Sequence, residues 1–113
     1  EEYLGVRPDT DAEGCLQDIH WPAGAFGYFP THTLGSVLAA QLDHHLRADV
    51  GDVDALVRAG DFAPIHEWLT ENVHRHGARY ETDALVREAT GEGFSAEHFL
   101  GYADEKYRDL YSC

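Results

Sequence analysis

The chain has no methionine, only one lysine (Lys106), and no apolar run that approaches the length of a membrane span. A transmembrane helix needs about 20 consecutive apolar residues, so we expect no membrane-spanning segment and no membrane partner. No signal-peptide pattern stands at the front of the chain, and we therefore expect a cytoplasmic protein. Because the chain opens without an initiator methionine, we expect its first residues to be a cut or processed end.

Cysteine is nearly absent as well, with only Cys15 and Cys113 in 113 residues. The two are far apart and form no C-x-x-C pair, which excludes a zinc ribbon and a dithiol redox site. Free thiols are the default in a cytoplasmic protein. We expect Cys15 to be a small buried residue rather than a nucleophile.

Positive charge is scarce. The chain has 21 acidic and eight basic residues, seven of them arginine, and a formal net charge of -13. This balance excludes nucleic acid as a partner. The carboxylates are spread along the chain rather than gathered in a tail, which is typical of a protein adapted to high salt, where screening relieves self-repulsion. The alternative is an ordinary acidic protein whose basic counterpart lies outside this chain.

Apolar residues recur at steps of three and four through most of the chain, the period of a helix with one buried face. Asp52 is placed to cap one such segment, and glycines stand just after several others. No strand alternation longer than a few residues occurs. The sequence predicts an all-α fold with one irregular Gly/Pro-rich loop at 14–31, and helices over 33–49, 52–59, 61–76, 82–90 and 95–111.

The loop at 14–31 concentrates hydrogen-bonding and aromatic side chains on backbone rich in glycine and proline, which is typical of a rigid binding loop. Asp18 and His20 are two residues apart, so extended backbone projects both to one side, and the carboxylate can orient the imidazole. The Tyr28 hydroxyl can donate to a carboxylate or an oxyanion. The candidate substrate-binding residues are Gln17, Asp18, His20 and Tyr28, with no catalytic residue. For His20, a purely structural role in pinning the loop stays open.

Eight histidines raise the question of a metal site. His44 and His45 are adjacent and point about 100° apart on a helix. His74 and His76 flank Arg75 near a predicted helix C-terminus, where positive charge is favourable. No pair has the i, i+4 spacing of a helical zinc site, so we assign no metal ligand.

The loop also carries a longer pattern: the segment Gly14-Cys15-Leu16-Gln17-Asp18-Ile19-His20-Trp21 fits G-x-x-Q-D-x-H-W at every fixed position. In this the sequence resembles the carboxypeptidase Taq family of metallocarboxypeptidases, and weaker matches follow from Gly27-Tyr28-Phe29-Pro30-Thr31 to Lys106-Tyr107. Members of that family are mostly helical enzymes several times longer than this chain. The resemblance implies that the chain is the C-terminal segment of such an enzyme.

The family binds its metal through a His-Glu-x-x-His helix and a later glutamate, both upstream of this signature. Neither that pattern nor the family's I-R-x-x-A-D motif occurs here; His66-Glu67 is followed by Trp68-Leu69-Thr70. The resemblance therefore implies zinc or cobalt as cofactor of the full-length enzyme, with its ligands outside this chain. A chain without those ligands cannot activate water, and we expect this segment alone to be inactive.

The resemblance implies a metal-dependent carboxypeptidase that releases C-terminal amino acids from peptides, with this chain as a substrate-binding flank of the groove. Its partners are peptide substrates and the remainder of the parent enzyme, which is expected to form a homodimer. His32 stands where relatives have tyrosine, which leaves its role open. The alternative is a non-catalytic all-α module that binds a peptide or protein. A third reading makes the aromatic helix 99–111 a dimer interface.

Overall fold

The computed structural model describes residues 3 and 5–112. In this part of the chain the structure is entirely helical and contains no strand, which confirms the all-α prediction. The chain divides into two compact units, Glu1–His32 and Thr33–Cys113. The α-helices are α1 (Pro30–Val50), α2 (Val53–Ala59), α3 (Ala63–Asn72), α4 (Thr82–Thr90) and α5 (Glu97–Tyr111), and the short 3-10 helices are η1 (Asp11–Glu13), η2 (Cys15–Gln17) and η3 (His74–His76).

Helix α1 begins at Pro30, three residues before the predicted start at 33. Proline suits the first helical position because its φ is already helical and it has no N–H to leave unpaired. The next two amides, of Thr31 and His32, donate to the carbonyls of Tyr28 and Phe29, each at 3.0 Å. The last residues of the predicted loop therefore form the first turn of the helix.

Capping residues define both ends of α2. The Asp52 side chain accepts a hydrogen bond of 2.9 Å from the Ala55 amide, which satisfies a donor left free at a helix N-terminus. Gly60 ends the helix with φ of 71°, in the left-handed region where glycine carries no steric cost. The predicted range 52–59 differs from the helix only by its cap.

The predicted helix 61–76 is shorter in the structure, where α3 ends at Asn72 and η3 follows. Asn72 donates from its side chain to the Trp68 carbonyl at 2.9 Å. This bond competes with the helical backbone ladder, and Val73 leaves the helical region with φ of -125°. The chain then tightens into a single 3-10 turn.

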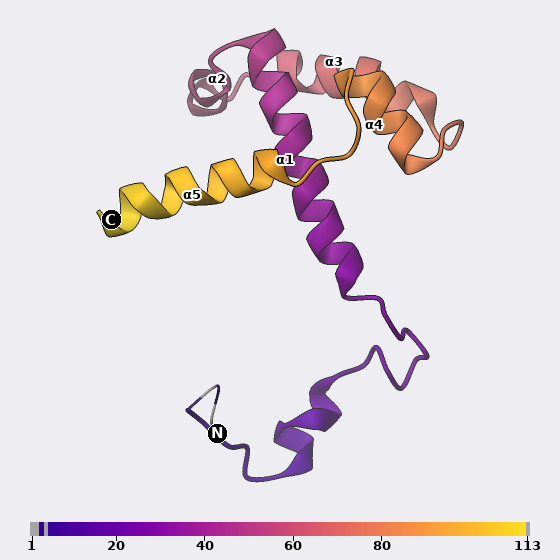
Figure 1. Ribbon diagram of the computed structural model, residues 1–113, viewed down its shortest axis with the longest axis vertical. Coiled ribbons are helices and arrows are strands. Elements are labelled where there is room, and N and C mark those ends of the chain that lie inside the picture. Colours follow the sequence, from indigo (N-terminus) through magenta and orange to yellow (C-terminus); the bar gives the residue numbers. More distant parts are fainter. Residues whose placement is uncertain (1–2, 4, 113) are drawn as a thin grey trace. The chain divides into compact units, whose positions relative to one another are not determined.

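Helix α4 occupies the predicted range 82–90, whereas α5 starts at Glu97 rather than at 95. Ser95 lies before the helix because its amide donates to Gln41 of α1 at 3.1 Å. Its hydroxyl accepts from the Glu97 amide at 3.2 Å. This link brings the segment before α5 against the middle of α1, as Figure 1 shows.

The core of the second unit lies where α1, α2 and α3 meet. Leu46, Val53 and Trp68 are buried together there, and Leu42, Val50, Ile65 and Leu69 pack around them. The Trp68 indole N–H donates to Asp49 Oδ2 at 2.7 Å, so the largest core residue has its polar atom satisfied.

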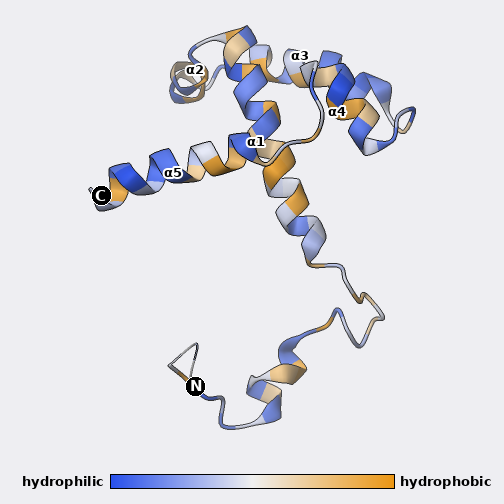
Figure 2. Ribbon diagram, in the orientation of Figure 1, coloured by the Kyte–Doolittle hydropathy of each residue, from blue (hydrophilic) through white to orange (hydrophobic). Residues whose placement is uncertain are grey.

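Much of the apolar surface is not covered within the chain. Helix α5 has no buried residue, and Figure 2 shows hydrophobic residues interspersed with hydrophilic ones along it. Large side chains of the first unit, among them Ile19, Trp21 and Phe26, are also exposed. No helix in the described part of the chain is long and apolar enough to span a membrane.

Candidate functional site

The loop at 14–31 is held by short-range backbone hydrogen bonds. The Ala25 amide donates to the His20 carbonyl at 2.8 Å, and the Gly24 amide donates to the Trp21 carbonyl at 2.9 Å. Gly24 and Gly27 have φ of 79° and 71°, a conformation that residues with a Cβ rarely adopt. These two glycines lie between His20 and Tyr28 and allow the chain to turn tightly there. The turn brings the rings of His20 and Tyr28 close together.

Asp18 and His20 form the central pair of this loop. Asp18 Oδ1 lies 3.0 Å from His20 Nδ1, and Asp18 Oδ2 accepts from the Trp21 amide at 2.8 Å. The carboxylate is thereby fixed from both oxygens. The sequence placed these two side chains on one side of the backbone, and in the structure they are in direct contact.

The electrostatics of the pair determine which atom of His20 is available. The hydrogen bond from the Trp21 amide, followed by that from His20, lowers the pKa of Asp18 below its usual 3.8. An ionised Asp18 accepts a hydrogen bond from His20 Nδ1–H, so in a neutral imidazole Nε2 is the unprotonated acceptor.

Aromatic rings surround His20. The Tyr28 ring stacks on it with centroids 5.5 Å apart and planes inclined by 19°, and the Phe29 ring lies at 4.6 Å. Tyr28 also meets His32 edge to face at 5.1 Å. The structure therefore groups Asp18, His20 and Tyr28, and adds Phe29 and His32, whose contacts the sequence did not indicate.

The hydrogen bond of the Gln17 side chain is not to Asp18, His20 or Tyr28. The side-chain amide donates to the Ala12 carbonyl at 2.5 Å, which ties η2 to η1. Cys15, also on η2, is exposed with a free thiol; the expectation of a buried Cys15 is wrong because η2 contains no buried residue. Cys113 lies outside the described residues.

The second unit contains a separate polar cluster. His45 Nε2 lies 3.1 Å from Glu92 Oε1, and His98 Nε2 lies 2.5 Å from the same oxygen. These contacts lower the pKa of Glu92 to about 2. The three residues belong to α1, the α4–α5 connection and α5, so no local spacing in the sequence could have predicted this cluster.

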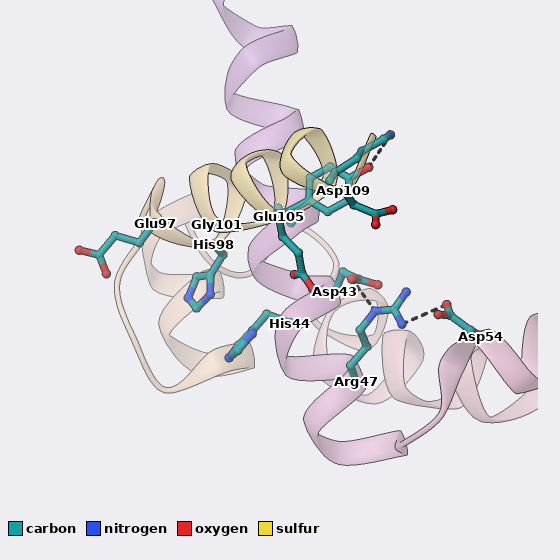
Figure 3. A pocket seen from close by; sticks show the side chains of 12 residues that line it. Asp43, His44, Arg47, Asp54, Glu97, His98, Gly101, Glu105 and Asp109 are labelled. Atoms are coloured by element: carbon teal, nitrogen blue, oxygen red, sulfur yellow. Dashed lines mark hydrogen bonds and ion pairs between the residues drawn. The ribbon is translucent and has the colours of Figure 1, made fainter. Parts of the chain in front are cut away.

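An open hollow of about 920 Å³ lies beside this cluster, between α1 and α5. Figure 3 shows His44 and His98 on one side of it and Arg47 with Asp43 and Asp54 on the other. Arg47 bonds to Asp43 at 2.8 Å and to Asp54 at 3.1 Å. These pairs place the Arg47 guanidinium between two carboxylates.

Comparison with known protein families shows the class of protein to which the chain belongs. Residues 1–107 match the family described as Carboxypeptidase Taq (M32) metallopeptidase. This is a class of metal-dependent peptidases, and the chain belongs to this family.

Curated relatives include Carboxypeptidase 1 of Bacillus subtilis (strain 168), 47% identical over 111 residues, and Thermostable carboxypeptidase 1 of Pyrococcus furiosus, 46% identical over 107 residues. These alignments cover 98% and 95% of this chain but 22% and 21% of the relatives. The chain thus spans about a fifth of the length of the curated relatives it matches.

Solved structures give the same result. A crystal structure of BsuCP is similar with a TM-score of 0.84 and 47% identity, over 96% of this chain and 22% of that one. Trypanosoma cruzi metallocarboxypeptidase 1 is similar with a TM-score of 0.82 and 44% identity, over 94% and 23%. The fold of this chain is therefore that of a segment of these larger proteins.

The signature loop does not fit the catalytic metal of a metallopeptidase. Its imidazole and carboxylate bond to each other, and no third donor joins them: among the residues that the structure describes, the one group of three metal-ligating side chains is His45, Glu92 and His98. A catalytic site of this class needs three protein ligands and an open position.

Proposed function

We propose that this chain is the C-terminal part of a metal-dependent carboxypeptidase and supplies one flank of its substrate groove. The observation that carries the proposal is the Asp18–His20–Tyr28 arrangement, because it presents an oriented acceptor and a phenol in the signature loop. Membership of the metallopeptidase family supports the reaction class. The names of the relatives, carboxypeptidases, support removal of single residues from peptide C-termini.

In this proposal each loop residue has its own task. Asp18 keeps His20 in one tautomer, so that Nε2 accepts a hydrogen bond from a substrate N–H. The Tyr28 hydroxyl donates to the terminal carboxylate or to the scissile carbonyl. Gln17 stays a substrate-binding candidate, and the bond of its side-chain amide to the Ala12 carbonyl fixes η2 at the start of the loop. Together these contacts hold the peptide near the reacting centre.

The parent enzyme would bind zinc or cobalt, which supplies a polarised water when bound, through residues outside this chain. The exposed apolar side chains of α5 and of the loop would pack against the remainder of that enzyme or across a homodimer. The net charge of -13 and the single lysine favour a salt-adapted protein.

The test uses the complete enzyme and an N-blocked dipeptide with a free C-terminal carboxylate. A hydrogen bond to a charged group contributes about 1.5–3 kcal/mol and one between neutral groups about 0.5–1.5 kcal/mol. Tyr28→Phe should therefore lower kcat/KM at least about tenfold, and His20→Ala about two- to tenfold. Circular dichroism should show unchanged helix content, because both side chains lie in an exposed or partly exposed loop.

Tyr111→Phe is the matched control, since it removes a phenol from the exposed end of α5 and should leave turnover unchanged. Wild-type turnover in both loop variants would reject the assigned roles. A complete protein that binds peptides through the loop without ever cleaving them would instead favour a non-catalytic peptide-binding module.

A further inference from the structure

Three potential ligands converge in the second unit without any role in the proposed function. They are His45 on α1, Glu92 in the α4–α5 connection and His98 in the first turn of α5. Their ligand atoms all lie within 4.8 Å of one another. From these we propose that His45, Glu92 and His98 form a binding site for a divalent transition-metal ion, with zinc as the best-suited ion.

The distances are close to those of a metal centre. In a tetrahedral zinc site with bonds of about 2.0–2.1 Å, neighbouring ligand atoms are about 3.3–3.4 Å apart. His45 Nε2 already lies 3.1 Å from Glu92 Oε1, and His98 Nε2 lies 2.5 Å from it. Small rotations of the two imidazoles and the carboxylate therefore open a central position for an ion.

The ligand types also match. Two imidazole nitrogens and one carboxylate oxygen are ligands that zinc accepts, whereas magnesium and calcium prefer oxygen alone. The exposed fractions of the side chains are 25% for His45, 43% for Glu92 and 19% for His98. Such partial burial holds the ligands in place and leaves the remaining position to water.

The carboxylate is positioned by residues behind it. Gln41, which is fully buried, donates to Glu92 Oε1 at 3.1 Å and to the Gly93 carbonyl at 2.9 Å. The Glu92 amide donates to Thr90 Oγ1 at 3.3 Å. Partners of this kind orient ligands before the ion arrives, which raises affinity.

The imidazoles are packed as well. The His44 ring lies on that of His98, with centroids 4.4 Å apart and planes inclined by 33°, and Figure 3 shows these two side chains close together. An ion bound by His45 and His98 would join α1 to the start of α5. Since α5 has no fully buried residue, such a link would add to the ring contact that already joins the two helices.

The probe for this site is Zn²⁺ itself, added by equilibrium dialysis and followed by elemental analysis. His45→Gln and His98→Gln should each bind one ion fewer per chain than the wild type, or bind that ion at least about tenfold more weakly. His66→Gln on α3 is the matched control and should bind as the wild type does. Circular dichroism verifies that each variant is folded.

The zinc-edge anomalous signal from crystals of the wild-type protein gives an answer that needs no variant. A peak within about 2.3 Å of His45 Nε2, His98 Nε2 and a Glu92 oxygen supports the site. Unchanged zinc binding in folded His45→Gln and His98→Gln proteins overturns it, and so does the absence of a peak at these atoms. Neither result bears on peptidase activity, so the proposed function is tested separately.

Discussion

Gln41 Nε2 donates a hydrogen bond of 3.1 Å to Glu92 Oε1, although the two residues are 51 positions apart in sequence. Gln41 is fully buried, and its carbonyl oxygen also accepts from the Ser95 amide at 3.1 Å. The Gln41 side chain of α1 thus forms hydrogen bonds to both Glu92 and Ser95 in the connection that leads into α5. A buried amide group with all its hydrogen-bond partners contributes more to the free energy of unfolding than its buried area alone accounts for. Removing it leaves those partners unpaired.

We therefore predict that Gln41→Leu destabilises the second unit by about 2–4 kcal/mol, since the Ser95 amide and the Gly93 carbonyl lose their partner. Urea unfolding followed at 222 nm measures the change. Amide hydrogen exchange should also become faster at Ser95 and in the first turn of α5.

Gln17→Leu is the matched control for that experiment. Gln17 is exposed and bonds to one carbonyl, that of Ala12, so its loss should cost less than about 1 kcal/mol and leave exchange at Ser95 unaltered. Equal losses from the two substitutions would contradict the central role of Gln41.

Trp68 provides the second prediction. Trp68 is 7% exposed, and its indole N–H donates to Asp49 at 2.7 Å. Trp68→Phe should cost about 1–3 kcal/mol in the free energy of unfolding, through the lost hydrogen bond to a charged group and the reduced volume. Trp21→Phe, at a residue 62% exposed, should cost less than about 0.5 kcal/mol. The fluorescence of the Trp21→Phe protein should be blue-shifted, and a red-shifted spectrum would show that Trp68 is not buried.

Protonation of Asp18 at low pH should weaken the hydrogen bonds that its carboxylate accepts in the loop. Its pKa is lowered in the folded chain, first by the Trp21 amide and then by His20. A depressed pKa means that the stabilisation is complete above the ordinary carboxyl value near 3.8 and is lost as the pH falls through the lowered value.

The measurement is the NMR shift of the Trp21 amide during titration. It should follow an apparent pKa below 3.8 in the wild type and should not titrate with this group in Asp18→Asn. A wild-type midpoint at or above 3.8 would mean that the hydrogen bond to Trp21 does not form in solution.

Local signals in the sequence predicted much of the fold. The Asp52 cap and the left-handed Gly60 are encoded within a few residues of the turns they form, and both are present in the structure. The helical period likewise gave the all-α class, which the structure confirms. Contact between Asp18 and His20 follows from their spacing of two residues.

What sequence could not provide are contacts between distant residues. The period of the helix 61–76 does not reveal that Trp68 rather than Phe62 is buried, because that depends on where α1 runs. The meeting of His45 with Glu92 and His98 depends in the same way on the path of the chain before α5. Burial of Cys15 was expected from residue type alone, and the exposed 3-10 turn at η2 overrides that preference.

Salt should stabilise this chain. With a net charge of -13, carboxylates repel one another in the compact state, and raising salt from about 0.1 M to about 1 M shortens the screening length from about 10 Å to about 3 Å. The thermal midpoint should rise steadily over this range in KCl. Glu67→Gln and Glu88→Gln, at exposed positions, should reduce the slope, and a midpoint indifferent to KCl would contradict salt adaptation.

The exposed apolar face of α5 gives the last prediction. Leu100, Tyr107 and Leu110 are each more than half exposed, and in the proposed enzyme they pack against sequence outside this chain. Leu110→Glu should therefore change the unfolding free energy of this chain by less than about 0.5 kcal/mol, yet lower that of the complete enzyme by about 2 kcal/mol or more, because a charge enters an apolar contact. Asp109→Asn, at the adjacent polar position, should be neutral in both. If Leu110→Glu is also neutral in the complete enzyme, this face of α5 is solvent-exposed there, and its apolar residues need a different partner.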